Sequence, residues 1–370
     1  MTGQTALAEV TPVATQSPWT PDRTAFAGLL DGQPAYRVKQ LWDGLYRNNT
    51  APDEQTNLPK SLRATLGERF APALRLANEQ RSADGGTIKW LWDLPNASRI
   101  ETVLMHYRDR STVCISSQAG CAMACGFCAT GQAGYDRNLT VGEILEQIVV
   151  ARRMAEPRRL SNIVFMGMGE PLANYNRLVE CLHRIIVDFE IGARNITVST
   201  VGLVPQMLRF AEEGLQVGLA LSLHAANDEL RTELVPLNAR HPIDDLVAAC
   251  QLFRERTGRR VSLEWAMIDG VNDRPSDMEE LAAVALAARA HVNLIPLNPT
   301  PGWPTVGTPP ARIEEFVAGL RARGVNATVR ANRGTDIDAA CGQLAAAAVG
   351  DGIAGSDSRT TTAVSLSPRR

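Results

Sequence analysis

Three cysteines stand close together in the chain, at the spacing Cys121-x3-Cys125-x2-Cys128. A structural zinc site normally uses four closed ligands, and no fourth cysteine or histidine lies near this trio. Three thiolates on one loop can instead hold three irons of a [4Fe–4S] cube and leave the fourth iron open to another ligand. The spacing therefore favours an iron–sulfur site. The alternatives are a zinc site completed from a distant part of the chain and a chance clustering of cysteines.

A second motif, Met166-Gly-Met-Gly169-Glu170-Pro171, follows an apolar run. Glycine lets the backbone approach a ligand closely, and a carboxylate at such a place can pair with an ammonium group. Taken alone, the motif is equally typical of a tight turn between a strand and a helix. Its place in the chain, one strand–helix unit after the cysteine loop, makes Gly169 and Glu170 candidate ligand contacts.

Polar residues also follow three later apolar runs, namely Ser199, then Ser222 with His224, then Asn298. A single residue of this kind is usually a cap or a turn former. Several of them at successive strand ends of one sheet indicate a mouth lined for a ligand.

Two further cysteines have no obvious place in a loop of cluster ligands. Cys114 lies seven residues before Cys121, inside an apolar run, and Cys341 lies in a polar, glycine-flanked segment near the end of the chain. A free cysteine is commonly a small buried hydrophobe, but the surroundings of Cys341 fit that interpretation poorly. Cys181 and Cys250 lie in amphipathic stretches, and we expect them to serve packing.

The elements that must position these residues alternate in type from residue 111 onward. Short Val- and Ile-rich runs predict strands at 112–116, 162–166, 195–200, 217–223, 260–268, 292–297 and 325–330. Amphipathic stretches predict helices at 140–154, 175–188, 204–213, 243–256, 276–290 and 310–323. Six successive β–α units predict an α/β fold with a parallel sheet, either doubly wound or a barrel, and in a barrel the chemistry sits at the carboxyl ends of the strands.

The rest of the chain divides into a helical module, a segment of strands that leads into the barrel, and two terminal tails. Residues 21–85 predict a small helical module, and residues 86–116 change to a strand pattern that leads into the barrel, whose predicted range is 86–347. Residues 1–20 and 348–370 predict disordered tails, because they carry little that could be buried.

Composition excludes several classes of protein. The 370 residues carry 38 basic and 40 acidic side chains, which excludes a chain that is basic throughout. No apolar run approaches the roughly 20 residues of a membrane span, and the first residues do not resemble a secretory signal, so we expect a cytoplasmic protein without a membrane partner. Seven cysteines are too few for a disulfide scaffold in a chain of this length.

Taken together, the motifs closely resemble one family, the bacterial dual-specificity radical S-adenosylmethionine (SAM) RNA methyltransferases of the RlmN type. The resemblance runs from about residue 24 to residue 347. It implies a radical-SAM partial (β/α)6 barrel with a small helical N-terminal module that helps to bind RNA. It also implies methylation of carbon 2 of adenosine in 23S rRNA and in certain tRNAs. The stretches that carry it are 116–131, 167–171, 222–225, 294–299 and 336–344.

The resemblance also implies a role for each matching residue. It implies that a [4Fe–4S] cluster is held by Cys121, Cys125 and Cys128. It implies that SAM is contacted by Gly169, Glu170, Ser199, Ser222, Leu223, His224 and Asn298. Cys341 would become S-methylcysteine during turnover, Cys114 would form a transient disulfide bond with it, and Glu101 would be the proton acceptor.

The implied reaction uses two SAM molecules for each methyl group delivered. One methylates Cys341, and the other is cleaved at the cluster to a radical that removes a hydrogen atom from the new S-methyl group. Carbon 2 of adenine is electron-poor, so it cannot displace the methyl group of SAM directly, but a carbon radical can add to it. An external electron donor is implied as well, and we expect the enzyme to act as a monomer.

Three other functions stay open on the residues alone. An enzyme of the sister type, which methylates carbon 8 of adenosine, shares the cluster and both outlying cysteines. A radical-SAM enzyme that activates or matures a protein would not need Cys341. An iron–sulfur electron carrier or sensor would need neither the Gly169-Glu170 motif nor the pair of outlying cysteines.

Overall fold

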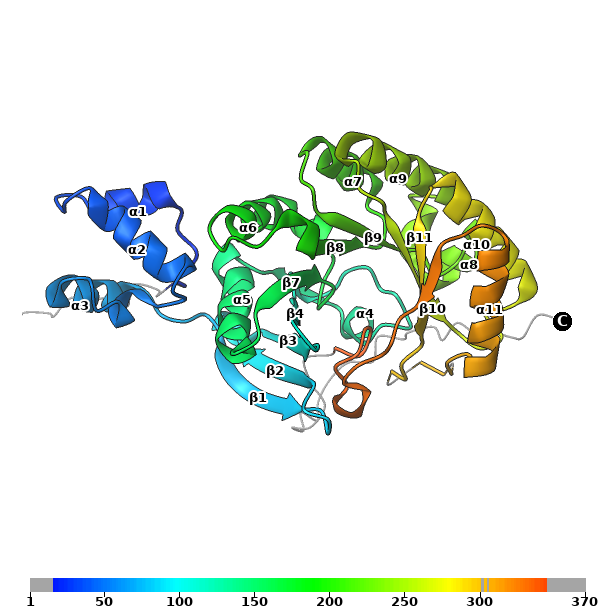
Figure 1. Ribbon diagram of the computed structural model, residues 1–370, viewed down its shortest axis with the longest axis horizontal. Helices are drawn as coiled ribbons and strands as arrows, with labels where there is room; N and C mark the ends of the chain where they lie inside the picture. The colour runs from blue at the N-terminus through cyan, green and yellow to red at the C-terminus, as the bar shows by residue number, and fades with distance from the viewer. Residues whose placement is uncertain (1–15, 301–302, 305, 345–370) are drawn as a thin grey trace, which may run out of the picture.

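A single curved sheet organises the molecule. The computed structural model describes residues 16–300, 303–304 and 306–344. Its main sheet has ten strands in the order β1-β2-β3-β4-β7-β8-β9-β10-β11-β12. From β4 onward all neighbours are parallel, and the covering helices lie outside the curve of the sheet (Figure 1). This arrangement is an α/β partial barrel, which confirms the predicted fold class.

Each predicted β–α unit has its counterpart in the barrel, displaced by no more than a few residues. The parallel strands are β4 (Ser111–Cys114), β7 (Leu160–Phe165), β8 (Ile196–Thr200), β9 (Gly218–Ser222), β10 (Ser262–Met267), β11 (His291–Pro296) and β12 (Ala327–Val329). The helices between them are α5 (Val141–Ala155), α6 (Tyr175–Val187), α7 (Val204–Glu212), α9 (Ile243–Thr257), α10 (Pro275–Ala287) and α11 (Pro310–Ala322). Helix α5 begins at a capping box between Thr140 and Glu143, as its sequence indicates.

Three antiparallel strands lead into the barrel. They are β1 (Arg75–Arg81), β2 (Thr87–Asp93) and β3 (Arg99–His106), and β3 pairs with β4. Strand β1 lies inside the segment 21–85 predicted to be helical, so that part of the prediction is wrong. Its side chains are almost all exposed, so its residues show no apolar alternation from which a strand could be read. Pairing with β2 supplies the structure that the local sequence does not specify.

Several short elements escape the sequence pattern because the helices span less than two turns and the strands have no more than four residues. They are β5 (Gln118–Gly120), β6 (Tyr135–Asn138), α4 (Ala129–Ala133) and α8 (Asp228–Leu234). Short 3-10 helices occur at Pro52–Glu54, Pro95–Ala97, Pro171–Asn174, Ala193–Asn195, Pro236–Ala239 and Thr335–Ile337. Strands β5 and β6 pair with each other and flank the cysteine loop.

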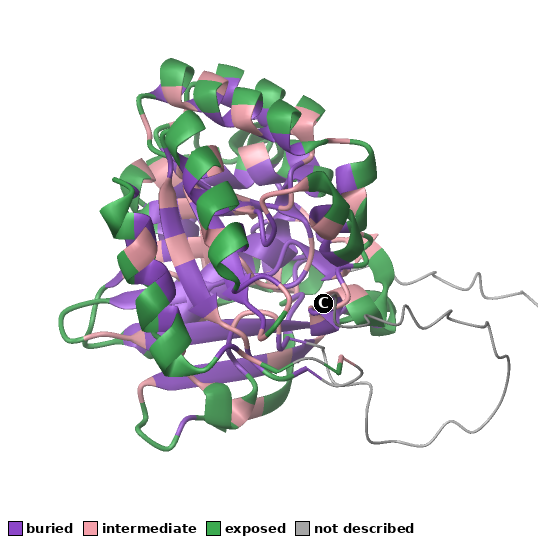
Figure 2. Cartoon of the chain, turned by 90° about the vertical axis from the view of Figure 1, so that its right-hand side faces the viewer, coloured by how far each residue is buried: buried purple, intermediate pink, exposed green. Residues whose placement is uncertain are grey.

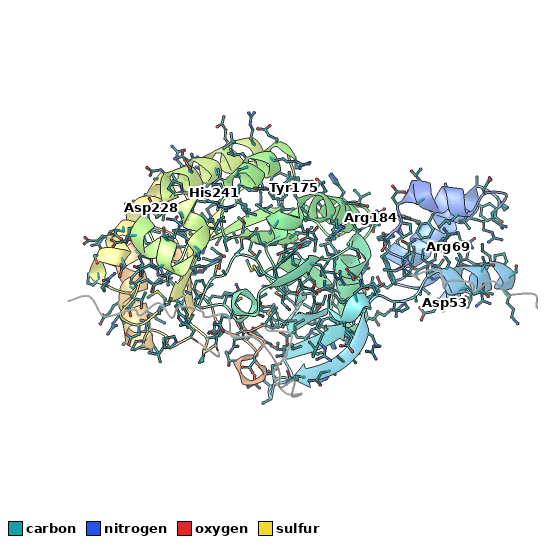
Figure 3. The ribbon with its side chains drawn as sticks, turned by 180° about the vertical axis from the view of Figure 1, so that it is seen from behind. Asp53, Arg69, Tyr175, Arg184, Asp228 and His241 are labelled. Carbon is teal, nitrogen blue, oxygen red and sulfur yellow. The ribbon has the colours of Figure 1, made fainter. Side chains whose placement is uncertain are left out.

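The N-terminal part is helical, as expected, in α1 (Arg23–Leu29), α2 (Tyr36–Tyr46) and α3 (Lys60–Arg69). These helices project from one side of the barrel next to α5 and α6 (Figure 1). The buried Arg184 of α6 lies at this junction (Figure 3), where it donates to the carbonyls of Trp19 and Pro21 and to the hydroxyl of Tyr46. The apolar core is continuous from this module into the barrel.

The prediction of a disordered tail over 1–20 is wrong for residues 16–20. Trp19 is only 3% exposed and its indole N–H donates to the carbonyl of Leu45, while Gln16 forms a bridge with Phe70. A lone tryptophan in a Thr/Ala/Pro-rich segment gives no periodic signal, so only the tertiary contacts reveal its burial. Residues 1–15 and the tail predicted at 348–370 lie outside the described residues.

Burial follows the layers of the fold. The barrel strands are buried and the helices expose their outer faces (Figure 2). Among the described residues, no helix combines the length and the apolar character needed to cross a bilayer.

Candidate active site

One cavity of about 160 Å³ opens at the carboxyl ends of the barrel strands. Most of the predicted site residues line it, although they come from six different segments of the chain. The predicted residues on its wall are Cys121, Cys125, Cys128, Gly169, Glu170, Ser199, Ser222, His224, Asn298 and Cys341. The structure therefore gathers at one place the motifs that the sequence presents separately.

The cysteine loop is held at both ends by backbone contacts. Gly120 has φ +73°, and a Cβ at this position would lie 2.0 Å from the carbonyl oxygen of Gly134. The same oxygen accepts a hydrogen bond of 2.7 Å from the N–H of Cys121. At the other end the N–H of Cys128 donates to the carbonyl of Cys125, and helix α4 begins at the next residue. This tight path turns all three thiols toward one cavity.

The donor set fits an iron–sulfur cluster. Burial raises the pKa of Cys121 to about 12 and raises the pKa values of Cys125 and Cys128 as well, so burial by itself favours neutral thiols. Metal binding would supply the charge that holds the thiolates, because the ligands lose protons as the metal binds. Among the described residues, no group of three His, Cys, Asp or Glu side chains is arranged to hold a single metal ion. A cube has a different requirement, because each thiolate then holds a different iron.

Gly169 and Glu170 form the wall beside the cysteine loop. Gly169 has φ +99°, and a Cβ there would lie 2.5 Å from Cβ of Gln118, so only glycine fits. The Glu170 carboxylate accepts the N–H of Leu172 at 3.0 Å and that of Val201 at 2.9 Å, which fixes its orientation. Burial raises the pKa of Glu170 to about 7. With the Thr200 side chain as a third donor, the carboxylate still keeps a lone pair for a ligand, and an ammonium group would restore the ionised form.

His224 forms another part of the wall as a neutral ring. Its Nδ1 accepts the N–H of Ala266 at 3.1 Å, so the ring proton lies on Nε2. Burial lowers the pKa of His224 to about 3. Phe127 of the cysteine loop packs edge-on against this ring at 4.7 Å between centroids. His224 therefore serves as a fixed neutral donor and packing surface beside the cluster loop.

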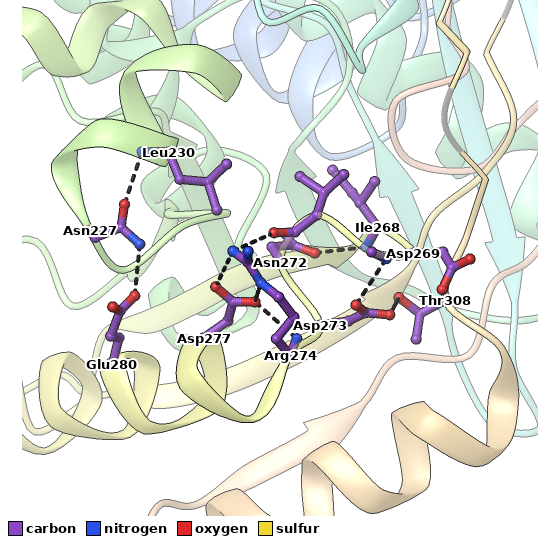
Figure 4. A network of polar contacts seen from close by, with 12 residues as sticks. Asn227, Leu230, Ile268, Asp269, Asn272, Asp273, Arg274, Asp277, Glu280 and Thr308 are labelled. Atoms are coloured by element: carbon purple, nitrogen blue, oxygen red, sulfur yellow. Dashed lines mark hydrogen bonds and ion pairs between the residues drawn. The ribbon is translucent and has the colours of Figure 1, made fainter. Parts of the chain in front are cut away.

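Buried polar groups hold the strand ends behind the cavity. Arg231 is fully buried and donates to the carbonyls of Val201, Ser222 and Leu223, which ties the end of β8 to the end of β9. After β10, Asn272 accepts the N–H of Ile268 and belongs to a polar network that extends to Asp277 and Thr308 (Figure 4). These contacts make the wall rigid, which a preorganised binding site requires.

Cys341 is placed against the cluster loop by its own neighbours. The carbonyl of Gly342 accepts the N–H of Ala129 at 2.8 Å, directly after Cys128. The Asn298 amide donates to the Cys341 carbonyl at 3.1 Å, and its oxygen accepts from Asn332 at 2.7 Å. Asn298, predicted from the resemblance as a SAM contact, thus also positions the Cys341 loop in this structure.

Cys114 lines a second cavity that adjoins the first. Met166, Arg330 and Cys341 line both cavities, so the wall between the two contains the Cys341 side chain. Burial, together with the nearby sulfur of Cys341, raises the pKa of Cys114 to about 12. All seven cysteines of the chain are free thiols in the structure, so it contains no disulfide bond between Cys114 and Cys341.

Glu101 lies outside both cavities but on a relevant face of the sheet. Its side chain is buried and lies 3.4 Å from the ammonium group of Lys89 on β2. Val103, two residues further along β3, pairs with Cys114 and lines the second cavity. Because alternate residues of a strand share a face, Glu101 belongs to the same side of the sheet as Cys114.

Leu223 is the predicted contact whose side chain the structure takes away from the cavity. It is fully buried among apolar residues that include Leu246, and only its backbone faces the site side, where its N–H donates to the Glu264 carbonyl. Conversely, Glu264 and Arg330 line the cavity but belong to none of the sequence motifs. A carboxylate inside the apolar run 260–268 was the available signal for Glu264, whereas nothing local distinguishes Arg330 from other arginines.

Comparisons with known proteins agree with this geometry. Residues 115–284 match the radical SAM superfamily, and that range spans the cysteine loop and most of the barrel. The chain is 48% identical to a radical SAM methyltransferase from Sphaerobacter thermophilus, whose crystal structure superposes with a TM-score of 0.87 over 90% of this chain and 100% of that one. The barrel and its three-cysteine loop thus define a radical SAM protein.

Relatives narrow the class further. The chain is 51% identical to a probable dual-specificity RNA methyltransferase RlmN from Parafrankia sp. (strain EAN1pec), with 88% of this chain and 89% of the relative covered. It is 49% identical to the protein of the same description from Mycolicibacterium smegmatis, with 88% and 94% covered. The chain belongs to the RlmN family of radical SAM proteins.

Proposed function

We propose that this protein is a radical SAM methyltransferase that methylates carbon 2 of adenosine in 23S rRNA and tRNA through a methylated cysteine. The observation that carries the proposal is the position of Cys341, on the wall shared by the cavity of the cluster cysteines and the cavity of Cys114. An electron carrier has no use for such a pair of thiols beside a cluster. The descriptions of the relatives, dual-specificity RNA methyltransferases, support RNA as the substrate class.

The family implies a [4Fe–4S] cluster and SAM, and the residues of the first cavity suit both. Cys121, Cys125 and Cys128 would hold the cluster, and Glu170 would hold the ammonium group of SAM. When bound, the two groups supply a radical that can remove a hydrogen atom from a methyl group. The neutral His224 ring and the apolar Phe127 beside it limit access of water to this part of the cavity.

Cys341 is the methyl acceptor of the proposed reaction. As a thiolate it attacks the methyl carbon of one SAM, so that the S–CH3 bond to Cys341 forms as S-adenosylhomocysteine leaves. In the second half of the cycle this carbon, after it has lost one hydrogen atom to the radical, bonds to carbon 2 of the target adenine. The adduct would then give one electron back to the cluster and its ring proton to Glu101. The Cys114 sulfur attacks the Cys341 sulfur, the S–C bond to the product breaks, and the released carbon takes a proton to become the methyl group. An external electron donor restores the two thiols.

Two features of Cys114 support its part in this scheme. It adjoins Cys341 in the second cavity, on the strand next to Glu101. Its pKa of about 12, raised by burial, keeps the thiol neutral and unreactive until the adduct has formed. The Arg330 guanidinium acts in the opposite direction and favours the thiolate that must finally attack.

The test is anaerobic turnover of the reconstituted protein with a 23S rRNA fragment and SAM labelled in its methyl group. Mass spectrometry of the digested RNA is expected to show labelled 2-methyladenosine with the wild type and none with Cys341→Ala. Cys250→Ala, which changes a thiol buried in α9 away from both cavities, is the matched control and is expected to keep activity. Labelled 8-methyladenosine would instead assign the protein to the sister reaction.

A further inference from the structure

Glu264 places an unsatisfied carboxylate oxygen at the first cavity. Its side chain on β10 is only 4% exposed and lines the cavity wall. Oε1 accepts hydrogen bonds from Ser262 Oγ at 2.8 Å and from Asn293 Nδ2 at 3.0 Å, so the carboxylate cannot rotate freely. Oε2 is buried and has no hydrogen-bond partner within the described part of the chain. An unmet buried acceptor is costly, so a ligand that donates here gains affinity.

Arg330 presents donors beside this acceptor. Its backbone N–H donates to the Leu294 carbonyl at 2.8 Å, which anchors the residue after β12 to strand β11. Its Nη1 lies 4.0 Å from Glu264 Oε2 and 3.6 Å from the sulfur of Met166. A separation of 4.0 Å is too long for a hydrogen bond. The two charged groups therefore face each other across a gap, with hydrogen-bonding capacity left for a third molecule.

The gap lies where the proposed reaction must take place. Arg330, Met166 and Cys341 line both cavities, and Glu264 lines the first. The Cys341 sulfur and the Glu264 carboxylate both raise the pKa of Arg330 above its usual range. A carbon carried by the Cys341 sulfur can reach only a ring that sits against this shared wall.

The hydrogen-bonding groups of adenine are complementary to those of Glu264 and Arg330. Carbon 2 of adenine has N1 as its ring neighbour, and the 6-amino group stands on the carbon beyond N1. The amino group donates and N1 accepts, which is the complement of a carboxylate beside a guanidinium. Guanine has the reverse pattern, because its O6 would face the carboxylate oxygen and its N1–H would face the guanidinium. A donor on N1 also withdraws electron density from carbon 2, which favours addition of a carbon radical there.

We propose that Glu264 and Arg330 read the amino edge of the target adenine, with Glu264 Oε2 accepting from the 6-amino group and Arg330 donating to N1. This inference rests on the proposed function. It identifies the pair as the residues that select adenine over guanine. SAM carries an adenine of its own, so the shared chemistry is a 6-aminopurine, and the experiment must separate the two sources.

The first arm compares two RNAs, one with adenosine at the target position and one with purine riboside, which lacks the 6-amino group. Values of kcat/KM are measured for wild type and for Glu264→Ala. Removing the amino group is expected to lower kcat/KM about 10- to 100-fold more in the wild type than in the variant, the range of a hydrogen bond to a charged group. The affinities for the two RNAs are also measured without reductant, so that no turnover occurs. Loss of the amino group is expected to weaken binding more in the wild type than in Glu264→Ala. Equal ratios in the two proteins would overturn the inference.

The second arm tests the cofactor as the source. Reductive cleavage without RNA is measured in both proteins for SAM and for a SAM analogue whose purine lacks the amino group. Loss of the amino group from the cofactor is expected to lower the rate of reductive cleavage by the same factor in the wild type and in Glu264→Ala. A larger cost in the wild type would assign the contact to SAM and overturn the assignment to the target base.

Two further variants guard the interpretation. Glu264→Gln keeps the shape of the side chain, so it replaces Glu264→Ala if that protein does not fold or does not take up a cluster. In Glu264→Gln, the factor by which loss of the 6-amino group lowers kcat/KM is expected to be smaller by about threefold or more, because the acceptor loses its charge. An unchanged factor would count against the inference. Glu279→Gln, an exposed carboxylate on α10, is the control and should keep the wild-type ratio. Absence of 2-methyladenosine from wild-type reactions would contradict the proposed function instead.

Discussion

The buried thiols at the site need a nearby positive charge to ionise, and the source of that charge differs between them. Burial raises the pKa of both Cys114 and Cys121 to about 12, and in each case a metal or a neighbouring cation must offset that cost before the sulfur can act. The three cysteines proposed to hold the cluster would obtain this from iron. Cys114 differs from them in role, and the group that favours its thiolate is the Arg330 guanidinium. Arg330 therefore acts both on the Cys114 thiol, which breaks the S–C bond of the adduct in the proposed reaction, and on the target adenine, to which we propose that it donates.

Replacing Cys114 by alanine should trap the reaction at the RNA adduct. Methyl transfer to Cys341 and addition to the ring do not need the Cys114 sulfur, whereas breaking the S–C bond does. We expect Cys114→Ala to accumulate as a protein covalently bound to RNA, seen as a band shifted in a denaturing gel and removed by ribonuclease. Cys181→Ala, which changes a buried thiol of α6, is the matched control and should show no such band. Free methylated RNA formed by Cys114→Ala at the wild-type rate would refute this role.

At the scale of elements, the sequence predicted the helices and strands that have a clear apolar period, and it missed those that have none. Six β–α units are visible in the sequence by their period, and α9 or α10 could be placed within a few residues. Strand β1 has mostly exposed side chains, and α4 and α8 are too short for any period to show. The site followed the same rule. Motif residues were found by type and local spacing, but the relation between Glu264 and Arg330 appears only when β10 and the end of β12 lie on either side of β11 in the sheet.

The basic residues of the N-terminal helices separate into two groups in the structure. Lys39 and Arg47 pair with Asp43, and Arg37 donates to Gln40 and to the Asn57 carbonyl. By contrast, the structure gives no ion pair within its described residues for three cations of α3, which are Lys60, Arg63 and Arg69. Arg69 lies out on this module, away from the barrel (Figure 3). We therefore narrow the expected RNA contacts of the module to helix α3.

Neutralising the α3 cations should weaken RNA binding in a salt-dependent way. The triple variant Lys60→Gln, Arg63→Gln, Arg69→Gln is expected to lower RNA affinity. The slope of log affinity against log salt should also fall, by about 0.7–0.9 for each RNA phosphate that the protein no longer neutralises. Reductive cleavage of SAM without RNA should stay at the wild-type rate, since α3 contributes no residue to either cavity.

The matched control for this experiment neutralises Arg37, Lys39 and Arg47. Lys39 and Arg47 already pair with carboxylates, and Arg37 donates to the neutral oxygens of Gln40 and Asn57. This second triple variant changes the net charge equally, and its salt slope should stay closer to that of the wild type. If the slope falls equally in both triple variants, α3 has no special role. If it falls in neither, RNA must bind elsewhere on the molecule.

On the scale of the whole molecule, buried polar groups join the helical module to the barrel. Arg184 of α6 donates to the carbonyls of Trp19 and Pro21, and Glu146 of α5 accepts the N–H groups of Ala73 and Leu74. Because groups on two adjacent helices hold the module, α3 keeps a fixed place relative to the cavity. A module fixed in this way can position RNA as well as bind it, which a flexibly tethered one cannot do.

The Glu146 contact should make this docking depend on pH. Burial raises the pKa of Glu146 to about 7, although hydrogen bonds from Ser17, Ala73 and Leu74 favour the ionised form. The docked state therefore binds more protons than the open state, in which the carboxyl is in water and titrates near about 4.3. The stabilising effect of the bound proton is complete at pH values below about 4, and it is lost as the pH rises through about 7. The cost of ionising the buried carboxyl reaches about 3 kcal/mol above that pH.

Replacing Glu146 by glutamine should remove this dependence while keeping an acceptor for the two backbone N–H groups. Hydrogen exchange of the Ala73 and Leu74 amides, corrected for the intrinsic effect of pH, measures the opening directly. Between about pH 5 and pH 8 the opening free energy of the wild type is expected to fall relative to that of Glu146→Gln, by an amount on the order of 3 kcal/mol. Glu212→Gln changes an exposed carboxylate of α7 and should follow the wild type at every pH. Parallel curves for wild type and Glu146→Gln would show that the Glu146 carboxyl does not control how the module is held.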